Sequence, residues 1–290
     1  MSTSTSQTEI RFDGKVAIVT GAAQGMGREH SLLLGKRGAQ VIVNDLDADG
    51  AESTAKAIRE SGALVDTAIE TWGRVDIVIN NAGIEIKKDF PDFSDADFAR
   101  MMDVHVWGTW RLTQIAWPHM QRQKYGRVLI VSSQSIFGMP QNVAYTTAKG
   151  ALFALGRTLA LEGQEHGIHV NMLGPVAGTA MAKQMLDGDE ASYQWAVSQY
   201  PASATSAVVA WLVHEECTAN GEFIASYGRG IGRVALTHSK GVVCKEEGEF
   251  TPEIARGNFE RAIGMDGALI LGSMQEVSDK IVSPGAHVDI

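Results

Sequence analysis

Residues 15–20 read KVAIVT, and residues 21–27 follow directly with GAAQGMG. The first run is short and rich in β-branched residues, which predicts a buried strand. An apolar-periodic run around Leu32, Leu33 and Leu34 comes next and predicts a helix. In this order the glycines let bare backbone approach a pyrophosphate that faces the N-terminus of the helix. A turn that serves only strand-to-helix packing is the alternative. The favoured interpretation is a doubly wound α/β sheet that holds a dinucleotide.

The second strand is predicted over residues 40–45, QVIVND, and it ends in the carboxylate of Asp45. A carboxylate at this point can accept hydrogen bonds from both hydroxyls of an adenosine ribose, and it repels a 2′-phosphate. The pattern therefore predicts NAD in preference to NADP. The alternative is that Asp45 only opens the following turn or caps the next helix.

The chain between the second strand and the next one is unusually short. Residues 51–72 have a helical pattern, and the following strand is predicted at residues 75–80. A doubly wound sheet normally has another strand in this interval, but no β-rich run bounded by turns occurs there. We therefore expect two successive helices or one long bent helix, and a sheet that lacks its usual third strand.

Polar or small residues close three further predicted strands. NNAG stands at residues 80–83, serines follow the strand at residues 127–132, and GPVAGT stands at residues 174–179. Because ligands bind at the carboxyl ends of the strands in such sheets, these segments are expected beside the dinucleotide. Turns built from Asn and Gly for purely structural reasons are the alternative.

Tyr145 and Lys149 open a predicted helix that continues to Glu162. Side chains four residues apart stand on one face of a helix, so the ammonium can lie near the phenol oxygen. Positive charge stabilises the phenolate and lowers the pKa of the phenol, which lets it exchange protons at neutral pH. A surface Tyr and Lys on an ordinary amphipathic helix is the alternative. Ser132, at the end of the preceding strand, is placed to hydrogen-bond a substrate carbonyl.

Composition argues against several classes of function. The 290 residues carry a net charge of −9, which argues against nucleic acid or an anionic membrane as the main partner. Cys217 and Cys244 are the only cysteines, too few for a disulfide framework and without metal-ligand spacing. We therefore expect no metal site and a cytoplasmic location. No apolar run approaches the length of a membrane span.

One large α/β domain is expected over residues 11–235, because the chain is long enough to bury a sizeable core. Residues 1–10 are polar and are expected to form a disordered tail. Residues 236–290 are expected to form a C-terminal extension that packs on the domain or on a neighbouring subunit. Residues 181–200 suit a lid over an apolar substrate, and a surface helical hairpin is the alternative.

The ordered set of motifs resembles the short-chain dehydrogenase/reductase family over about residues 10–235. The resemblance implies a Rossmann-like fold in which Tyr145 is the acid/base and Lys149 holds the nicotinamide ribose and lowers the tyrosine pKa. Ser132 would orient the substrate carbonyl, since the family's serine usually stands thirteen positions before its tyrosine; a shift by one residue to Ser133 is the alternative. The cofactor-binding residues implied are Gly21, Gln24, Gly25, Met26, Gly27, Asp45, Leu46, Asn81, Ala82, Gly83, Tyr145, Lys149, Pro175 and Thr179.

His105 stands where the family commonly has an asparagine, within the segment VHVWG. A lone histidine on a helix is usually a satisfied, partly buried group. The segment is similar to the (R)-3-hydroxyacyl-CoA dehydrogenase part of multifunctional enzyme type 2 and its bacterial relatives, which makes His105 a candidate site residue that holds a water linking Lys149 to solvent. The main departure from the family is the lost third strand, because one wall of the adenine pocket is lost with it.

The expected function is an NAD-dependent oxidoreductase that transfers a hydride between NAD(H) and a secondary alcohol or ketone. A 3-hydroxyacyl-CoA and a hydrophobic secondary alcohol are both candidate substrates. The alternative is a binding or scaffolding protein that keeps the fold but has a damaged adenine site. The family resemblance also implies a homodimer or homotetramer.

Overall fold

The structure is a computed structural model that describes residues 9–45, 53–186, 188–243, 250–282 and 288–289. Packing divides the chain into two units, residues 1–233 and residues 234–290, and each is described by itself. All but the last two residues of the tail expected at residues 1–10 lie outside the described part.

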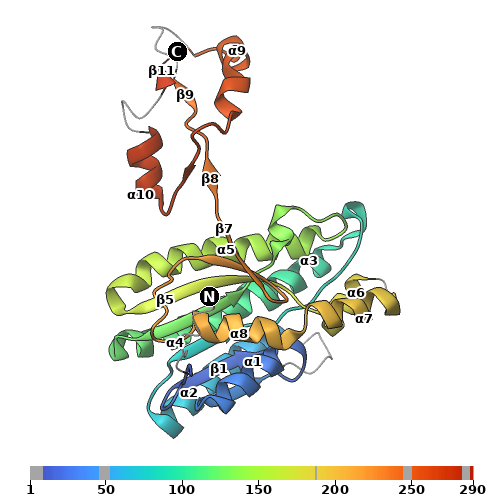
Figure 1. Cartoon of the computed structure of the whole chain (residues 1–290), viewed down its shortest axis with the longest axis vertical. Coiled ribbons are helices and arrows are strands. Elements are labelled where there is room, and N and C mark those ends of the chain that lie inside the picture. Colours follow the sequence, from blue (N-terminus) through green and yellow to red (C-terminus); the bar gives the residue numbers. More distant parts are fainter. Residues whose placement is uncertain (1–8, 46–52, 187, 244–249, 283–287, 290) are drawn as a thin grey trace, which may run out of the picture. The chain divides into compact units, whose positions relative to one another are not determined.

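The first unit is built on a seven-stranded sheet with the order β2-β1-β3-β4-β5-β6-β7 (Figure 1). Each successive pair in this order from β2 to β6 is parallel, which confirms the predicted doubly wound, Rossmann-like α/β fold. The strands are β1 (Val16–Thr20), β2 (Gln40–Asn44), β3 (Ile77–Asn80), β4 (Gly126–Val131), β5 (Ile168–Val176), β6 (Phe223–Tyr227) and β7 (Gly230–Val234).

Helices cover both faces of this sheet, with α1 packed on α8 and α2 packed on α4 (Figure 1). Short 3-10 turns and one π-helical turn join them. The helices are α1 (Gly25–Lys36), α2 (Ser53–Trp72), α3 (Asp95–Met102), α4 (Gly108–Gln123), α5 (Val143–Gly163), α6 (Ala180–Met185), α7 (Glu190–Gln199) and α8 (Ala202–Leu212). The segment expected as a lid or a helical hairpin is thus helical, as α6 and α7.

The core of the first unit lies on both faces of the sheet because successive strand residues point to opposite sides. On the face covered by α1 and α8, one buried cluster joins Val19 and Ile79 of the strands to Leu34 and Val209 of the helices. Each such side chain contributes about 1.5–3 kcal/mol when it leaves water. On the other face α5 approaches closely at Gly156, where a Cβ would collide with the sulfur of Met172.

The sheet ends at β2, and no strand stands beyond it among the described residues. β1 pairs with β2 on one side and with β3 on the other, so the chain crosses from one side of β1 to the other after β2. Between them α2 is one helix of 20 residues, rather than two helices in succession. The expected loss of the third strand therefore holds for the described part of the chain; residues 46–52 lie outside it.

The helical stretch that contains His105 is interrupted by one wide turn. It consists of α3, a π-helical turn at Asp103–Trp107, and α4. α3 starts with a capping box, in which the Ser94 hydroxyl accepts from the backbone of Asp97 and the Asp97 carboxylate accepts from the backbone of Ser94. The π turn holds His105 fully buried. Such single wide turns occur frequently at functional sites.

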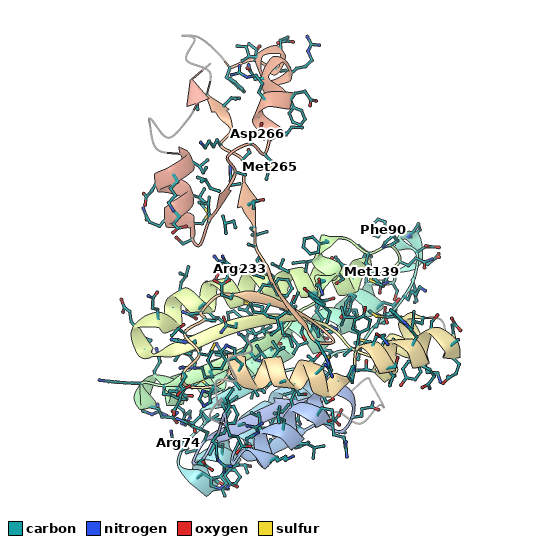
Figure 2. The ribbon with its side chains drawn as sticks, in the orientation of Figure 1. Arg74, Phe90, Met139, Arg233, Met265 and Asp266 are labelled. Carbon is teal, nitrogen blue, oxygen red and sulfur yellow. The ribbon has the colours of Figure 1, made fainter. Side chains whose placement is uncertain are left out.

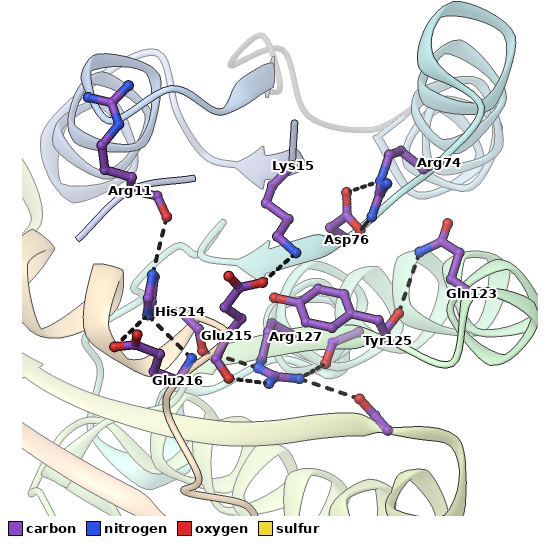
Figure 3. Close-up of polar contacts among 12 residues, drawn as sticks. Arg11, Lys15, Arg74, Asp76, Gln123, Tyr125, Arg127, His214, Glu215 and Glu216 are labelled. Atoms are coloured by element: carbon purple, nitrogen blue, oxygen red, sulfur yellow. Dashed lines mark hydrogen bonds and ion pairs between the residues drawn. The ribbon is translucent and has the colours of Figure 1, made fainter. Parts of the chain in front are cut away.

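A polar network closes the amino ends of the strands (Figure 3). Asp76 is fully buried and accepts hydrogen bonds from the backbone N–H of Val16 at 2.9 Å and from the guanidinium of Arg74 at 2.7 Å. The Tyr125 ring lies between Lys15 and Arg127, at 4.2 Å and 4.6 Å from their charged groups. Burial raises the pKa of the Tyr125 hydroxyl to about 12. This end of the sheet serves stability, since the dinucleotide turn lies at the opposite end.

The second unit is small and its strands are short. β8 pairs with β10 antiparallel and β9 pairs with β11 parallel. Its elements are β8 (Thr237–His238), β9 (Val242–Val243), α9 (Pro252–Ile263), β10 (Leu269–Ile270), α10 (Met274–Val277), a π turn (Ser278–Val282) and β11 (Val288–Asp289). Figure 2 shows the side chains of both units, with Arg233 as the last residue of the first and Met265 in the second.

Among the described helices, none is both long enough and apolar enough to cross a membrane. The described residues also contain no cluster of His, Cys, Asp and Glu suited to a metal ion.

Candidate active site

The carboxyl ends of β1 and β3 are tied together by Thr20 and Asn81. The Thr20 hydroxyl accepts from the backbone N–H groups of Asn81 and Ala82, both at 3.1 Å. The Asn81 amide donates to the carbonyls of Thr20 and Gly21, at 2.9 Å and 3.0 Å. Gly21 has a φ of +62°, and a Cβ there would lie 2.7 Å from the Cα of Ala82. Two of the predicted segments, the glycine-rich turn and NNAG, are therefore in direct contact.

The glycine-rich turn fits a dinucleotide pyrophosphate. α1 begins at Gly25, the side chain of its N-cap residue Gln24 makes no capping hydrogen bond, and no acidic residue stands in its first turn. Its N–H groups therefore suit an anion. A Cβ on Gly25 would meet only the side chain of Thr179, at 3.7 Å and 3.8 Å, so the turn leaves space here and has Thr179 as its neighbour. At Gly27 a Cβ would collide with the carbonyl of Gly21, which explains this glycine by packing.

The other expected cofactor residues fall around this turn. The carboxylate of Asp45 accepts a hydrogen bond from the backbone N–H of Ala23 at 2.7 Å, so it lies against the turn. Pro175 lies near the carboxyl end of β5. Gln24 is the N-cap residue of α1, and Met26 is partly buried against the core. Leu46 lies outside the described residues.

Tyr145 and Lys149 stand one turn apart on α5, and both are buried, with 6% and 3% of their surfaces exposed. Lys149 Nζ donates to the carbonyl of Val131 at 2.7 Å and lies 5.4 Å from the centre of the Tyr145 ring. Burial lowers the pKa of Lys149 from 10.5 to about 7. Lys149 can therefore gain or lose its proton near neutral pH.

The pKa of Tyr145 differs from the expectation. Burial raises the pKa of the Tyr145 hydroxyl to about 12; a hydrogen bond with Ser133 acts to lower it, and the charge of Glu85 acts to raise it. The sequence suggested that Lys149 lowers the pKa of Tyr145, but the protein without a bound cofactor has this pKa raised instead. The physical reason is that the phenolate loses its solvation, while the ammonium is itself weakened by burial and held by a backbone carbonyl.

The two serines after β4 have different environments. The hydroxyl of Ser132 is buried and donates to the backbone carbonyl of Lys149 at 2.8 Å. The hydroxyl of Ser133 accepts from the backbone of Ser135 at 3.0 Å and is the one that hydrogen-bonds Tyr145. The structure therefore does not support Ser132 as the serine beside the phenol, and Ser133 takes that position. The cause is the side-chain alternation of an extended chain, which turns neighbouring residues to opposite sides.

His105 lies against Tyr145, with ring centres 5.5 Å apart in an edge-to-face arrangement. Its Nε2 is 2.8 Å from the carbonyl oxygen of Ile84, and its Nδ1 is buried without a hydrogen-bond partner among the described residues. Burial and the charge of Lys149 hold the pKa of His105 well below its usual range. Gly83 allows the close approach, since a Cβ there would lie 2.7 Å from the imidazole. His105 is therefore a buried group beside Tyr145, and its role in holding a water stays a prediction.

Apolar side chains surround Tyr145 on its remaining side. A buried cluster of Met101, Ala144 and Tyr145 is packed by five partly buried residues: Ile84, Ile86, Phe93, Met181 and Met185. The five come from the segment after NNAG, from the loop before α3 and from α6. Met181 and Met185 belong to the segment expected as a lid or a helical hairpin, and the other three were not identified from the sequence. The apolar spacing of IEI directly after NNAG was the available signal. Glu85, between the two isoleucines, is also buried and was missed.

Comparison with known proteins agrees with this arrangement. The family model for short chain dehydrogenases matches residues 15–190. The peroxisomal multifunctional enzyme type 2 of Mus musculus is 35% identical over 305 residues, which cover 97% of this chain and 41% of that protein. The (2S)-[(R)-hydroxy(phenyl)methyl]succinyl-CoA dehydrogenase subunit of Thauera aromatica is 32% identical over 208 residues, 66% of this chain and 83% of that protein.

A solved structure shows the same fold. The full-length peroxisomal multifunctional enzyme type 2 from Drosophila melanogaster matches with a TM-score of 0.75 and 28% identity, over 94% of this chain and 49% of that one. The chain spans half the length, or less, of the two type 2 multifunctional enzymes, from Mus musculus and Drosophila melanogaster.

These relatives contradict the expected cytoplasmic location, because five of them are named as peroxisomal enzymes. The expectation was wrong because a low cysteine count indicates only a reducing environment, which does not distinguish one compartment from another. The resemblance to the multifunctional enzymes is confirmed, and the family follows from the match over residues 15–190 together with the fold. The chain belongs to the short-chain dehydrogenase family.

Proposed function

We propose that this oxidoreductase transfers a hydride between NAD(H) and a secondary alcohol or ketone, with Tyr145 as the acid/base. The observation that carries the proposal is the pair of buried ionisable groups, Tyr145 and Lys149, next to a turn that fits a pyrophosphate. Buried groups with displaced pKa values are typical of catalytic sites. When bound, the nicotinamide ring supplies the hydride acceptor or donor.

Side chains of this chain transfer the proton to and from the substrate oxygen. With its pKa raised to about 12, the Tyr145 hydroxyl is protonated at neutral pH and can donate to the oxygen of a ketone. Ser133, which already hydrogen-bonds this hydroxyl, orients the same substrate oxygen in place of Ser132. Lys149, with a pKa of about 7, can return a proton to the phenolate. Oxidation of an alcohol needs the phenolate and therefore speeds up as the pH rises.

His105 is a positioning residue in this scheme. Its Nε2 lies 2.8 Å from the carbonyl oxygen of Ile84 and 3.3 Å from the backbone nitrogen of the same residue. The tautomer proposed here is the one in which Nε2 donates to the carbonyl, so that Nδ1 of the neutral ring carries no proton and can only accept. An orphaned acceptor beside Tyr145 and Lys149 suits a water that passes protons to the lysine. This supports the role that the resemblance implied for the histidine.

For the cofactor we propose NAD in preference to NADP, since the carboxylate of Asp45 lies against the glycine-rich turn at the end of β2. A 2′-phosphate on the ribose would meet this negative charge. For the substrate, the apolar cluster around Tyr145 favours an alcohol carbon with apolar substituents. A 3-hydroxyacyl-CoA remains a candidate because a relative is named for a hydroxyacyl-CoA compound.

The test of this function is a panel of secondary alcohols and 3-hydroxyacyl-CoA esters, assayed with NAD⁺ for the absorbance of NADH. Tyr145→Phe should remove nearly all turnover of an active substrate, a loss of more than about a thousandfold, while NADH binds as before. A Phe variant that retains turnover would refute Tyr145 as the acid/base.

The second candidate, a binding or scaffolding protein, is favoured by the end of the sheet at β2. Titration with NADH by fluorescence decides between the two. Absence of binding at millimolar NADH rules out the enzyme and leaves the scaffold.

We also propose a homodimer or homotetramer, with residues 236–290 packed on the domain or on a neighbouring subunit. Exposed aromatic side chains at Trp107 and Trp110, and exposed apolar residues such as Phe259 and Ile263 in the second unit, support contacts with other surfaces. Size-exclusion chromatography with light scattering tests the assembly, and a monomer at micromolar concentration would contradict it.

A further inference from the structure

Glu85 is a buried carboxylate in the segment that follows NNAG. Only 7% of its surface is exposed, and its neighbours Ile84 and Ile86 both pack against the buried cluster that contains Tyr145. Carboxylates are seldom buried in proteins, because removing their charge from water costs free energy. A carboxylate buried next to a reacting group is typical of a site in which the charge has a function.

Contacts on either side of Glu85 fix the position of this segment. Before it, the carbonyl oxygen of Ile84 lies 2.8 Å from Nε2 of His105. After it, the backbone N–H of Lys88 donates to the carbonyl of Gln141 at 2.9 Å, in the loop that leads into α5. Since α5 carries the candidate acid/base, the segment is held against the helix on which the chemistry is proposed to occur.

The charge of Glu85 reaches the phenol of Tyr145. Burial is the largest cause of the raised pKa of the Tyr145 hydroxyl, and the negative charge of Glu85 raises that pKa further. Lys149 offsets this charge only in part at pH 8, because burial lowers its pKa to about 7. Burial and the charge of Lys149 also hold the pKa of His105 well below its usual range, so its ring is neutral there. A second negative charge near the phenol is therefore repelled.

We propose that Glu85 is a specificity-determining residue, which excludes substrates that carry a negative charge close to the reacting carbon. That carbon must lie against the Tyr145 hydroxyl for the proton to pass, so a carboxylate a few bonds away from it meets Glu85 in apolar surroundings, where water screens the repulsion little. The site accepts uncharged secondary alcohols, including esters and thioesters of hydroxy acids, and rejects the free acids. The inference rests on the proposed function and names the substrate class of the same site.

The test compares methyl 3-hydroxyoctanoate with 3-hydroxyoctanoate, assayed with NAD⁺ at pH 8 for the formation of NADH. The measured quantity is the ratio of kcat/KM for the ester to kcat/KM for the acid. Where neither compound is turned over, the ratio comes from their inhibition constants against an alcohol that the panel shows to be active. Glu85→Gln should lower this ratio by about tenfold or more, as two unit charges several ångströms apart predict. The gain should come from the acid, with the ester changed by less than about threefold.

Two further variants separate charge from packing. Glu85→Asp keeps the charge and should keep the preference for the ester, and loss of the preference in this variant would overturn the proposal. Asp92→Asn removes an exposed carboxylate from the same loop and should leave the ratio unchanged, because water screens that charge. A change of packing at residue 85 would affect the ester and the acid alike, so it would leave the ratio where it was.

The failure of this inference differs from the failure of the proposed function. If uncharged alcohols are oxidised and the ratio in Glu85→Gln stays within about threefold of the wild-type ratio, only the role of Glu85 is refuted. If no alcohol of the panel supports the reduction of NAD⁺, the proposed function fails and this inference fails with it.

Discussion

Replacing Lys149 by methionine should make the protein more stable while removing its proton-transfer function. Lys149 is 3% exposed, and burial lowers its pKa from 10.5 to about 7. At about 1.4 kcal/mol per pH unit, the buried ammonium costs about 5 kcal/mol of folding free energy below pH 7. Methionine fills a similar volume without charge, but it gives up the hydrogen bond to Val131, worth about 1 kcal/mol. The net gain at pH 6 is therefore about 3–4 kcal/mol.

The pH dependence gives the sign of the effect. Between about pH 7 and pH 10.5 the unfolded lysine is protonated and the folded one is neutral. The unfolded state binds more protons there, so the stability of the wild type rises with pH in this window, by about 1.4 kcal/mol per unit. Below about pH 7 both states are protonated and the full penalty remains. Above pH 10.5 it vanishes. Lys149→Met should lack this slope.

Urea unfolding followed by circular dichroism at pH 6, 7, 8 and 9 measures both quantities. Lys36→Met is the matched control, because Lys36 is an exposed lysine in the last turn of α1. That variant should keep the wild-type slope. If Lys149→Met is no more stable than the wild type at pH 6, or if its stability runs parallel to the wild type from pH 7 to 9, the reasoning from burial is refuted.

The remaining predictions concern the serines, the ribose carboxylate and the amino end of the sheet. Ser133→Ala should lower kcat by about 10²-fold or more, whereas Ser132→Ala should mainly cost about 1 kcal/mol of stability, since its hydroxyl only bonds a helix carbonyl; equal kinetic losses in both variants would contradict this assignment. Asp45→Ala should weaken NAD more than NADP, measured as the ratio of their KM values, and an unchanged ratio would leave Asp45 as a turn residue. Asp76→Ala should destabilise the fold by about 3 kcal/mol, because it leaves a buried backbone N–H and Arg74 without their acceptor. A free energy of unfolding within about 0.5 kcal/mol of the wild type, the size of an ordinary surface change, would argue against it.

The missing third strand of the sheet could be predicted from the residue pattern alone. The absence of any β-rich run between residues 45 and 72 predicted a sheet without its third strand, and the described residues have β2 at the edge. The helical pattern did not distinguish one helix from two, because Gly62 is compatible with both. The single helix α2 results from its packing on α4, which no local pattern contains.

The candidate site divides in the same way. The spacing of Tyr145 and Lys149 placed them on one helical face, and both lie together in the structure, although their catalytic roles stay predictions. Spacing along the chain could not decide whether Ser132 or Ser133 lies against the phenol, because a shift of one residue in an extended chain reverses the side-chain direction, and Ser133 is the one that hydrogen-bonds Tyr145. His105 was placed in a continuous helix, and the π turn that buries it was not foreseen.

The sequence by itself determined the order of strands and helices, the glycine-rich turn and the missing strand, because these depend on local periodicity and on backbone freedom at glycine. Only the tertiary structure decided which serine hydrogen-bonds the phenol of Tyr145 and in which direction the pKa values of Tyr145 and Lys149 shift. The pKa of Tyr145 rises to about 12 and that of Lys149 falls to about 7 because segments far apart in the chain exclude water from both. Desolvation is a property of the assembled fold, so no spacing of residues along the chain can reveal its magnitude.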